Sequence, residues 1–117
     1  MEHVVVFAEK GTFAGWPANN GVWVWDDQEI LVGCTVGGYV ERQGLHSIEP
    51  PYGNLLCRSL DGGHTWRQED PRNFVGDSEE LTDPPSDVTL NQSGFAMRVV
   101  GDTYHGSNEK RGGFFYS

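Results

Sequence analysis

The sequence is poor in positive charge and contains no long apolar run. Of its 117 residues only 8 are Lys or Arg, against 17 Asp or Glu, which gives a net charge of −9. Such a chain repels nucleic-acid phosphates and its basic residues are scattered, so nucleic-acid binding is not expected. No apolar stretch approaches the length of a membrane span, so we do not expect a membrane protein.

Cysteine is equally scarce. Cys34 and Cys57 are too few for a disulfide scaffold and lack metal-site spacing, and we interpret them as half-buried thiols of strands. No cluster of His, Cys or carboxylate side chains shows ligand spacing, so neither a metal nor a cofactor is predicted. The residues after Met1 lack the pattern of a signal peptide. The sequence leaves open whether the protein is cytoplasmic or exported.

What the sequence does contain is glycine, aromatic residues and strand-like segments. There are 16 glycines, four Trp, four Tyr and six Phe, and helical periodicity is almost absent. The segments 21–25 and 29–33, separated by Asp26-Asp27, predict an antiparallel hairpin. Gly37-Gly38 permits a bulge after it. We also interpret as strand-like the segments 3–7, 34–36, 55–59, 94–100 and 113–117. These patterns predict an all-β fold.

Three stretches are typical of connections. The segment 43–54 contains Pro50-Pro51, and paired prolines are incompatible with a central strand, so we expect a surface loop there. The segment 68–91 is rich in proline and acidic residues and predicts a long connection. A further loop is expected at 102–111.

The most specific motif is the octapeptide at 59–66, Ser-Leu-Asp-Gly-Gly-His-Thr-Trp. The Asp61 side chain can accept hydrogen bonds from backbone N–H groups ahead of it and close an Asx-type turn. The two glycines after it allow the positive φ of a tight hairpin. Thr65 can hydrogen-bond back across the turn, and Trp66 can cover it. The octapeptide therefore predicts a self-contained hairpin clasp.

This octapeptide resembles the Asp-box of the sialidase-like, or BNR, β-propellers, and it matches at all five fixed positions, Ser59, Asp61, Gly63, Thr65 and Trp66. In that family the box joins the third and fourth strands of a blade, on the side away from the substrate. The resemblance therefore implies a structural role for these five residues. His64 occupies a variable position and is expected to be solvated.

The rest of the chain resembles the same family. The stretches 15–33 and 95–117 resemble the first and second blades of bacterial exo-α-sialidase-like proteins. With about four strands per blade, the resemblance implies part of a six-bladed propeller, with blade 1 at about 3–69 and an incomplete blade 2 at about 92–117. Ser117 aligns with Ser59, so we expect a second box to begin there and the sequence to be an N-terminal fragment. Full-length protein is expected to be monomeric.

The resemblance implies a glycosidase acting on terminal sialic acids. Family members bind the sugar carboxylate with three arginines and use a Tyr–Glu pair as nucleophile and an Asp as acid/base. Gly15 stands where the first arginine is expected, and the other arginines and the Tyr–Glu pair belong to later blades. The identity of the substrate sugar, sialic acid or another glycan, therefore stays undecided. The fragment alone is expected to be inactive.

Five residues are candidates for the site. Glu49 lies in the loop that carries the family's acid/base and could act as general acid if burial raised its pKa, or be merely solvated. His46 could orient a sugar hydroxyl or be incidental. Trp16, Asn19 and Asn20 offer an aromatic face and two amides, a common combination for binding a sugar. The alternative interpretation of these three residues is a turn at the entry to a strand, with Trp16 packed in the blade.

Two functions follow from these candidates. The first is a glycoside hydrolase with a glycan or glycoconjugate as its substrate. The alternative is a non-catalytic Asp-box propeller that binds carbohydrate or protein. A convergent acid and base would favour the hydrolase.

Overall fold

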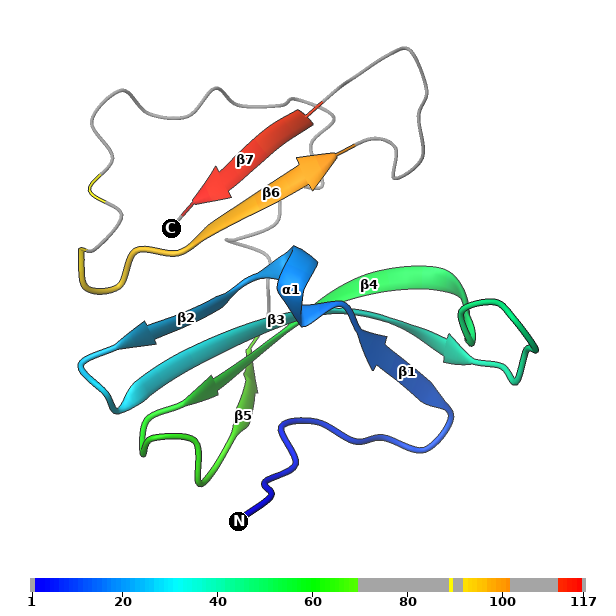
Figure 1. Ribbon diagram of the computed structural model, residues 1–117, viewed down its shortest axis with the longest axis horizontal. Helices are drawn as coiled ribbons and strands as arrows, with labels where there is room; N and C mark the ends of the chain where they lie inside the picture. The colour runs from blue at the N-terminus through cyan, green and yellow to red at the C-terminus, as the bar shows by residue number, and fades with distance from the viewer. Residues whose placement is uncertain (1, 70–88, 90–91, 102–111, 117) are drawn as a thin grey trace. The chain divides into compact units, whose positions relative to one another are not determined.

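The computed structural model describes residues 2–69, 89, 92–101 and 112–116. The chain divides into two compact units, residues 1–71 and 72–117, and each is described by itself (Figure 1). Within these described ranges, no helix has the length and apolar character needed to cross a membrane.

The first unit is an antiparallel sheet with one short helix. Its elements are β1 (Thr12–Gly15), α1 (Pro17–Asn20), β2 (Val22–Trp25), β3 (Glu29–Tyr39), β4 (Ile48–Ser59) and β5 (Arg67–Glu69). The strand order is β1-β3-β4-β5, and β2 also pairs with β3. Because β1 and β2 pair with successive halves of β3, they share one position in the sheet and α1 interrupts them (Figure 1). The sheet is thus an antiparallel meander of four positions, and the all-β prediction is confirmed.

The predicted hairpin is formed by β2 and β3. Trp25 pairs with Glu29 across a loop in which Asp26 and Asp27 have φ values of 52° and 57°. Positive φ at both positions gives a turn whose twist matches that of the strands. The apolar run at 3–7, in contrast, forms no strand. The strand of this region is β1, which pairs with residues 35–38 of β3.

The predicted bulge is present, since the β3–β4 register shifts between Val36 and Gly38. The predicted loop at 43–54 is wrong in its second half, because β4 begins at Ile48 and includes both prolines. In that part β4 pairs with β3 alone, since β5 reaches only residues 56–58. Pro50 and Pro51 also fall inside the register shift, between Glu49 opposite Gly38 and Gly53 opposite Val36, so no residue of β3 pairs with them. Such an edge position tolerates proline.

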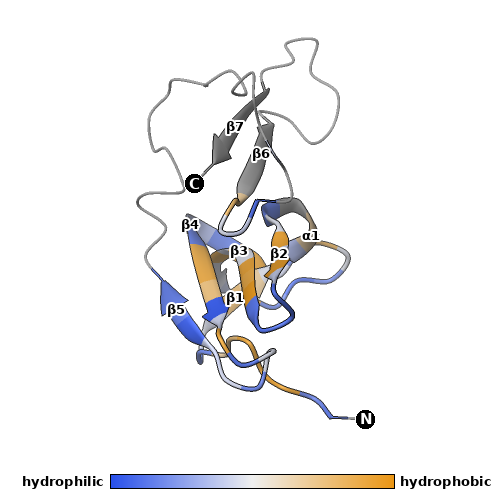
Figure 2. Ribbon diagram, turned by 90° about the vertical axis from the view of Figure 1, so that its left-hand side faces the viewer, coloured by the Kyte–Doolittle hydropathy of each residue, from blue (hydrophilic) through white to orange (hydrophobic). Residues whose placement is uncertain are grey.

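Apolar side chains occupy both faces of the sheet. Directly opposite residues in an antiparallel pair share a face. One face carries Leu31, which is 3% exposed, and also the buried Trp25 and Leu56. The other face carries Val32 with Cys57 opposite it. Figure 2 shows apolar segments in β2 and β4. Strands with apolar residues on both sides are typical of a sheet that is covered on both faces.

The octapeptide at 59–66 forms the predicted clasp between β4 and β5. The Thr65 backbone N–H and hydroxyl donate to the two Asp61 carboxylate oxygens over 2.9 and 2.6 Å. The Ser59 hydroxyl donates to Asp61 over 2.7 Å and accepts from the Gly63 N–H over 2.8 Å. The hydrogen bonds from Thr65, followed by that from Ser59, hold the pKa of Asp61 well below its usual range. The carboxylate therefore works as a permanent acceptor inside the turn.

The other parts of the clasp also agree with the prediction. Gly62 and Gly63 have φ values of 69° and 94°. The Trp66 indole folds back and donates from Nε1 to the Gly63 carbonyl oxygen over 2.8 Å. The Gly62 N–H donates to the Gln28 carbonyl oxygen in the β2–β3 turn, also over 2.8 Å. His64 is exposed, as expected for a variable position.

The described part of the second unit contains one antiparallel pair, β6 (Met97–Gly101) and β7 (Gly112–Tyr116). The register runs from Met97 opposite Tyr116 to Gly101 opposite Gly112. Strands expected at 94–100 and 113–117 are therefore present, although β6 begins three residues later than expected. The predicted loop 102–111, most of the connection 68–91, and Ser117 lie outside the described residues.

Candidate functional site

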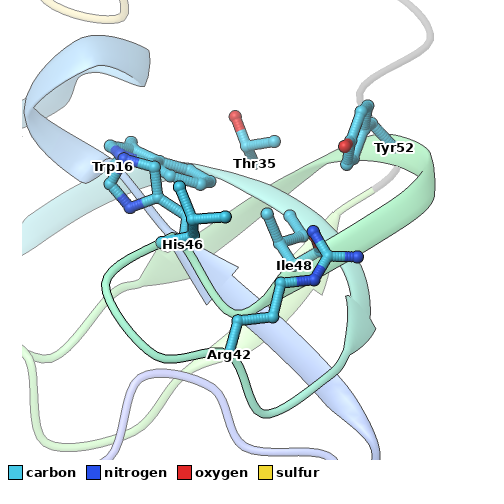
Figure 3. A pocket seen from close by; sticks show the side chains of 7 residues that line it. Trp16, Thr35, Arg42, His46, Ile48 and Tyr52 are labelled. Carbon is cyan, nitrogen blue, oxygen red and sulfur yellow. The ribbon is translucent and has the colours of Figure 1, made fainter.

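A cavity of about 410 Å³ lies at the beginning of β4, while the clasp follows the end of that strand. Its walls come from the residue before α1, from β3, from the loop 40–47 and from β4 (Figure 3). Seven described residues line it: Trp16, Thr35, Arg42, Leu45, His46, Ile48 and Tyr52. Thr35 lies four residues after Leu31 in β3, so the cavity is on the face that carries Leu31.

An aromatic wall on one side of the cavity is built on an unusual backbone conformation. Trp16 has φ 55° and ψ 49°, in the left-handed region. A bulky residue seldom adopts this conformation, which costs about 1–3 kcal/mol. The indole ring contacts His46 edge-on, with ring centroids 4.9 Å apart, and Phe13 at 5.3 Å. In Figure 3 Trp16 and His46 lie side by side. The strained residue thus directs its ring to the cavity.

Asn20, at the end of α1, holds this region together. It is 4% exposed. Its backbone N–H donates to the Trp16 carbonyl oxygen over 3.1 Å, and its side-chain Nδ2 donates to the same oxygen over 2.9 Å. Nδ2 also donates to Thr35 Oγ1 over 3.0 Å. Gly33 of β3 allows the close approach, because a Cβ there would lie 2.8 Å from the Asn20 carbonyl oxygen.

The opposite side of the cavity carries Arg42 and Tyr52. Arg42 is exposed, and its Nη1 donates to the Ile48 carbonyl oxygen over 3.2 Å, which places the guanidinium beside the cavity. Tyr52 is exposed on β4. The lining thus combines aromatic rings, aliphatic side chains, the hydroxyls of Thr35 and Tyr52 and the cation of Arg42, and none of the seven lining residues is a carboxylate. Such a surface can stack on a ligand and donate hydrogen bonds to it.

The structure brings together some of the residues that the sequence singled out and not others. Trp16 and His46 line the cavity and contact each other. Asn20 does not line the cavity, but it donates a hydrogen bond to the carbonyl oxygen of Trp16. Asn19 belongs to α1, and its side chain lies outside the described part of the structure. Glu49 is exposed and follows Ile48 in the strand, so its side chain lies on the opposite face, against Gly38.

Sequence reasoning assigned no role to Arg42, Thr35 or Tyr52. Arg42 lies in the same loop as the candidate His46, between β3 and β4. Tyr52 lies in the segment 43–54, for which the neighbouring prolines predict a loop, whereas the structure places it in β4. The sequence does contain a signal for the position of Thr35, because alternation along β3 puts its side chain on the same face as that of Leu31. In the described part of the chain, no group of three or more His, Cys, Asp or Glu side chains could hold a metal ion.

Comparison with family models, with curated proteins and with solved structures finds no match to this chain. The case for a function therefore depends on the clasp, on the sheet and on the geometry of the cavity.

Proposed function

We propose that this chain is part of a sialidase-like Asp-box β-propeller and that its cavity is a glycan-binding site. The first support is the position of the clasp. It joins β4 to β5, the third and fourth positions of a four-position antiparallel meander. This is the place that the Asp-box occupies in a blade of the family that the sequence resembles.

The apolar character of both sheet faces is the second support. In a propeller, sheets pack around a central channel, so each sheet has a neighbour on both sides. Val22 and Val24, which lie on the face of Cys57, are 55% and 57% exposed in this chain. A neighbouring blade would cover such positions.

The cavity itself carries the proposal of glycan binding. It lies at the end of β4 away from the clasp, where a family member would bind its substrate. The indole of Trp16 and the ring of Tyr52 offer faces on which the C–H groups of a sugar can stack. Arg42 and Thr35 add donors for hydroxyl or carboxylate oxygens. An aromatic wall with a few polar groups is the composition of a small-molecule site.

Within this cavity the geometry supports recognition better than hydrolysis. Glycoside hydrolysis requires an acid and a base, commonly two carboxylates. The seven lining residues include none, and Glu49 lies on the other face of the sheet. We therefore propose a binding role for this part of the molecule. A hydrolase is the second candidate, favoured by the family resemblance and by the cation of Arg42 beside the cavity, and its acid and base would come from residues outside the cavity.

Isothermal titration calorimetry with three methyl glycosides, an α-sialoside, a β-galactoside and a β-N-acetylglucosaminide, tests the proposal. We expect at least one of them to bind. Tyr52→Ala should weaken that binding about tenfold, because a stacking ring is lost. Tyr39→Ala is the matched control, since Tyr39 is also exposed but does not line the cavity. The proposal fails if no glycoside binds, or if both variants weaken binding equally.

A further inference from the structure

We infer that Asn20 is a positioning residue of the cavity, which fixes the Trp16 ring and directs the Thr35 hydroxyl to the ligand. Asn20 does not line the cavity itself. Both of its roles follow from the two N–H groups of its side-chain amide, one for each neighbour.

The first role concerns the backbone of Trp16. A helix of four residues such as α1 has little stability of its own. The Trp16 carbonyl oxygen nevertheless accepts two hydrogen bonds from Asn20, one from the backbone and one from the side chain. These bonds hold the peptide after Trp16 while that residue keeps its left-handed conformation. The orientation of the indole toward His46 therefore depends on the Asn20 amide.

The second role concerns the direction of a hydroxyl. The Trp16 carbonyl can only accept, so the amide nitrogen of Asn20 must be the atom that faces it. The second N–H of the same nitrogen then reaches Thr35 Oγ1. Because Oγ1 accepts from Asn20, the Thr35 O–H is left to donate in another direction, and the Thr35 side chain lines the cavity. Asn20 thus makes Thr35 a hydrogen-bond donor toward a ligand.

The side chain of Asn20 is buried, and the two ends of its amide differ in their hydrogen bonding. Its Oδ1 is buried and has no hydrogen-bond partner among the described residues. An unpaired buried oxygen destabilises a fold. The two donations from the amide nitrogen, to Trp16 and to Thr35, act against that cost, and both need an amide at position 20.

The contact between the Trp16 and His46 rings gives a direct readout of the first role. In Asn20→Asp an oxygen replaces the donor without a change of shape, so the nuclear Overhauser effects between the two rings should disappear. Gln28→Glu is the matched control, because Gln28 also donates from its amide to a backbone carbonyl, over 3.3 Å, but at an exposed position. Retention of the ring contact in Asn20→Asp would overturn the inference.

A double-mutant cycle tests the same role in case Asn20→Asp does not fold. Glycine adopts the left-handed region readily, so Trp16→Gly removes the strain that Asn20 is inferred to hold. We expect Asn20→Ala to lower the folding equilibrium constant about tenfold in Trp16→Gly, where only hydrogen bonds are lost, and at most about twofold in the wild-type background, where release of Trp16 from its left-handed conformation offsets part of that loss. Equal reductions in both backgrounds would overturn the inference.

The second role rests on the proposed glycan site and is tested with the methyl glycoside that the wild-type chain binds, among the three named above. Thr35→Val should weaken binding about tenfold through loss of one donor, and Thr35→Ser should restore it. Equal binding by Thr35→Val and wild type would overturn this role. If wild type binds none of the three glycosides, the proposed function fails, while the ring contact and the cycle still decide the role of Asn20.

Discussion

Addition of one methyl group at Gly33 tests how β3 supports the cavity. Gly33 is buried, and its N–H donates to the Gly21 carbonyl oxygen over 2.9 Å. In Gly33→Ala the new Cβ would lie 2.8 Å from the Asn20 carbonyl oxygen and 3.1 Å from the Asn20 Cβ. The first distance is to a backbone atom and is shorter than Cβ contacts in proteins. Consequently α1 and β3 must move apart.

The magnitude follows from two opposing effects. Overpacking of this kind destabilises a fold by about 1–3 kcal/mol. Alanine in place of glycine restricts the unfolded chain and returns about 0.4–1 kcal/mol. We therefore expect the free energy of unfolding of Gly33→Ala to fall by about 1–2 kcal/mol. Displacement of Asn20 should also weaken the contact between Trp16 and His46.

Urea unfolding followed by circular dichroism measures this change, and Gly53→Ala on β4 is the matched control. A Cβ at Gly53 would meet only a methyl group of Val36, at 3.3 Å. That contact can relax by a small movement of a side chain, so we expect Gly53→Ala to lie within about 0.5 kcal/mol of wild type. Equal stabilities of the two variants would refute the argument that α1 packs closely on Gly33.

Three further predictions concern acid stability, catalysis and thiol reactivity. Hydrogen bonds lower the pKa of Asp61, and Arg58 lowers that of Glu69, so their stabilisation is present above the unfolded-state values of about 4 and is lost as pH falls below them. Thermal melts between pH 6 and pH 2 should show a smaller acid-induced loss in Asp61→Asn than in wild type, and equal losses would contradict this. The 117-residue chain should release no fluorophore from a fluorogenic sialoside above background, and measurable release would contradict the binding role. Cys57 is 1% exposed and burial raises its pKa, so a thiol reagent at pH 8 should label it only as fast as the chain unfolds, not at once.

Elements with strong local turn chemistry could be predicted from the sequence. The clasp depends on Asp61, Thr65 and the glycines between them, and all their partners lie within a few residues. The β2–β3 hairpin was predictable for the same reason. β1 was missed because Thr12–Gly15 carries a weak strand signal and is held by pairing with β3. Assignment of strands from local apolarity fails when pairing with another strand decides whether a segment is extended.

The candidate site was less accessible to sequence reasoning. Trp16 and His46 could be selected by residue type, but their contact requires a left-handed backbone at Trp16 and the path of the loop 40–47. The face of Glu49 depends on the strand register, in which a shift of one residue moves a side chain to the other side of the sheet. The bulge between Val36 and Gly38 sets that register. Only the paired strands together specify it.

The hydrogen bond from Gly62 to Gln28 ties together two turns at one end of the sheet. At the other end, the loop 40–47 is closed by a single backbone bond from the Val40 N–H to the Ser47 carbonyl oxygen, and residues 41–46 are all exposed. Replacement of 41–46 would therefore alter Arg42 and His46 without disturbing the framework. This end of the protein is suited to diversification, whether by natural divergence or by selection from a library of grafted loops.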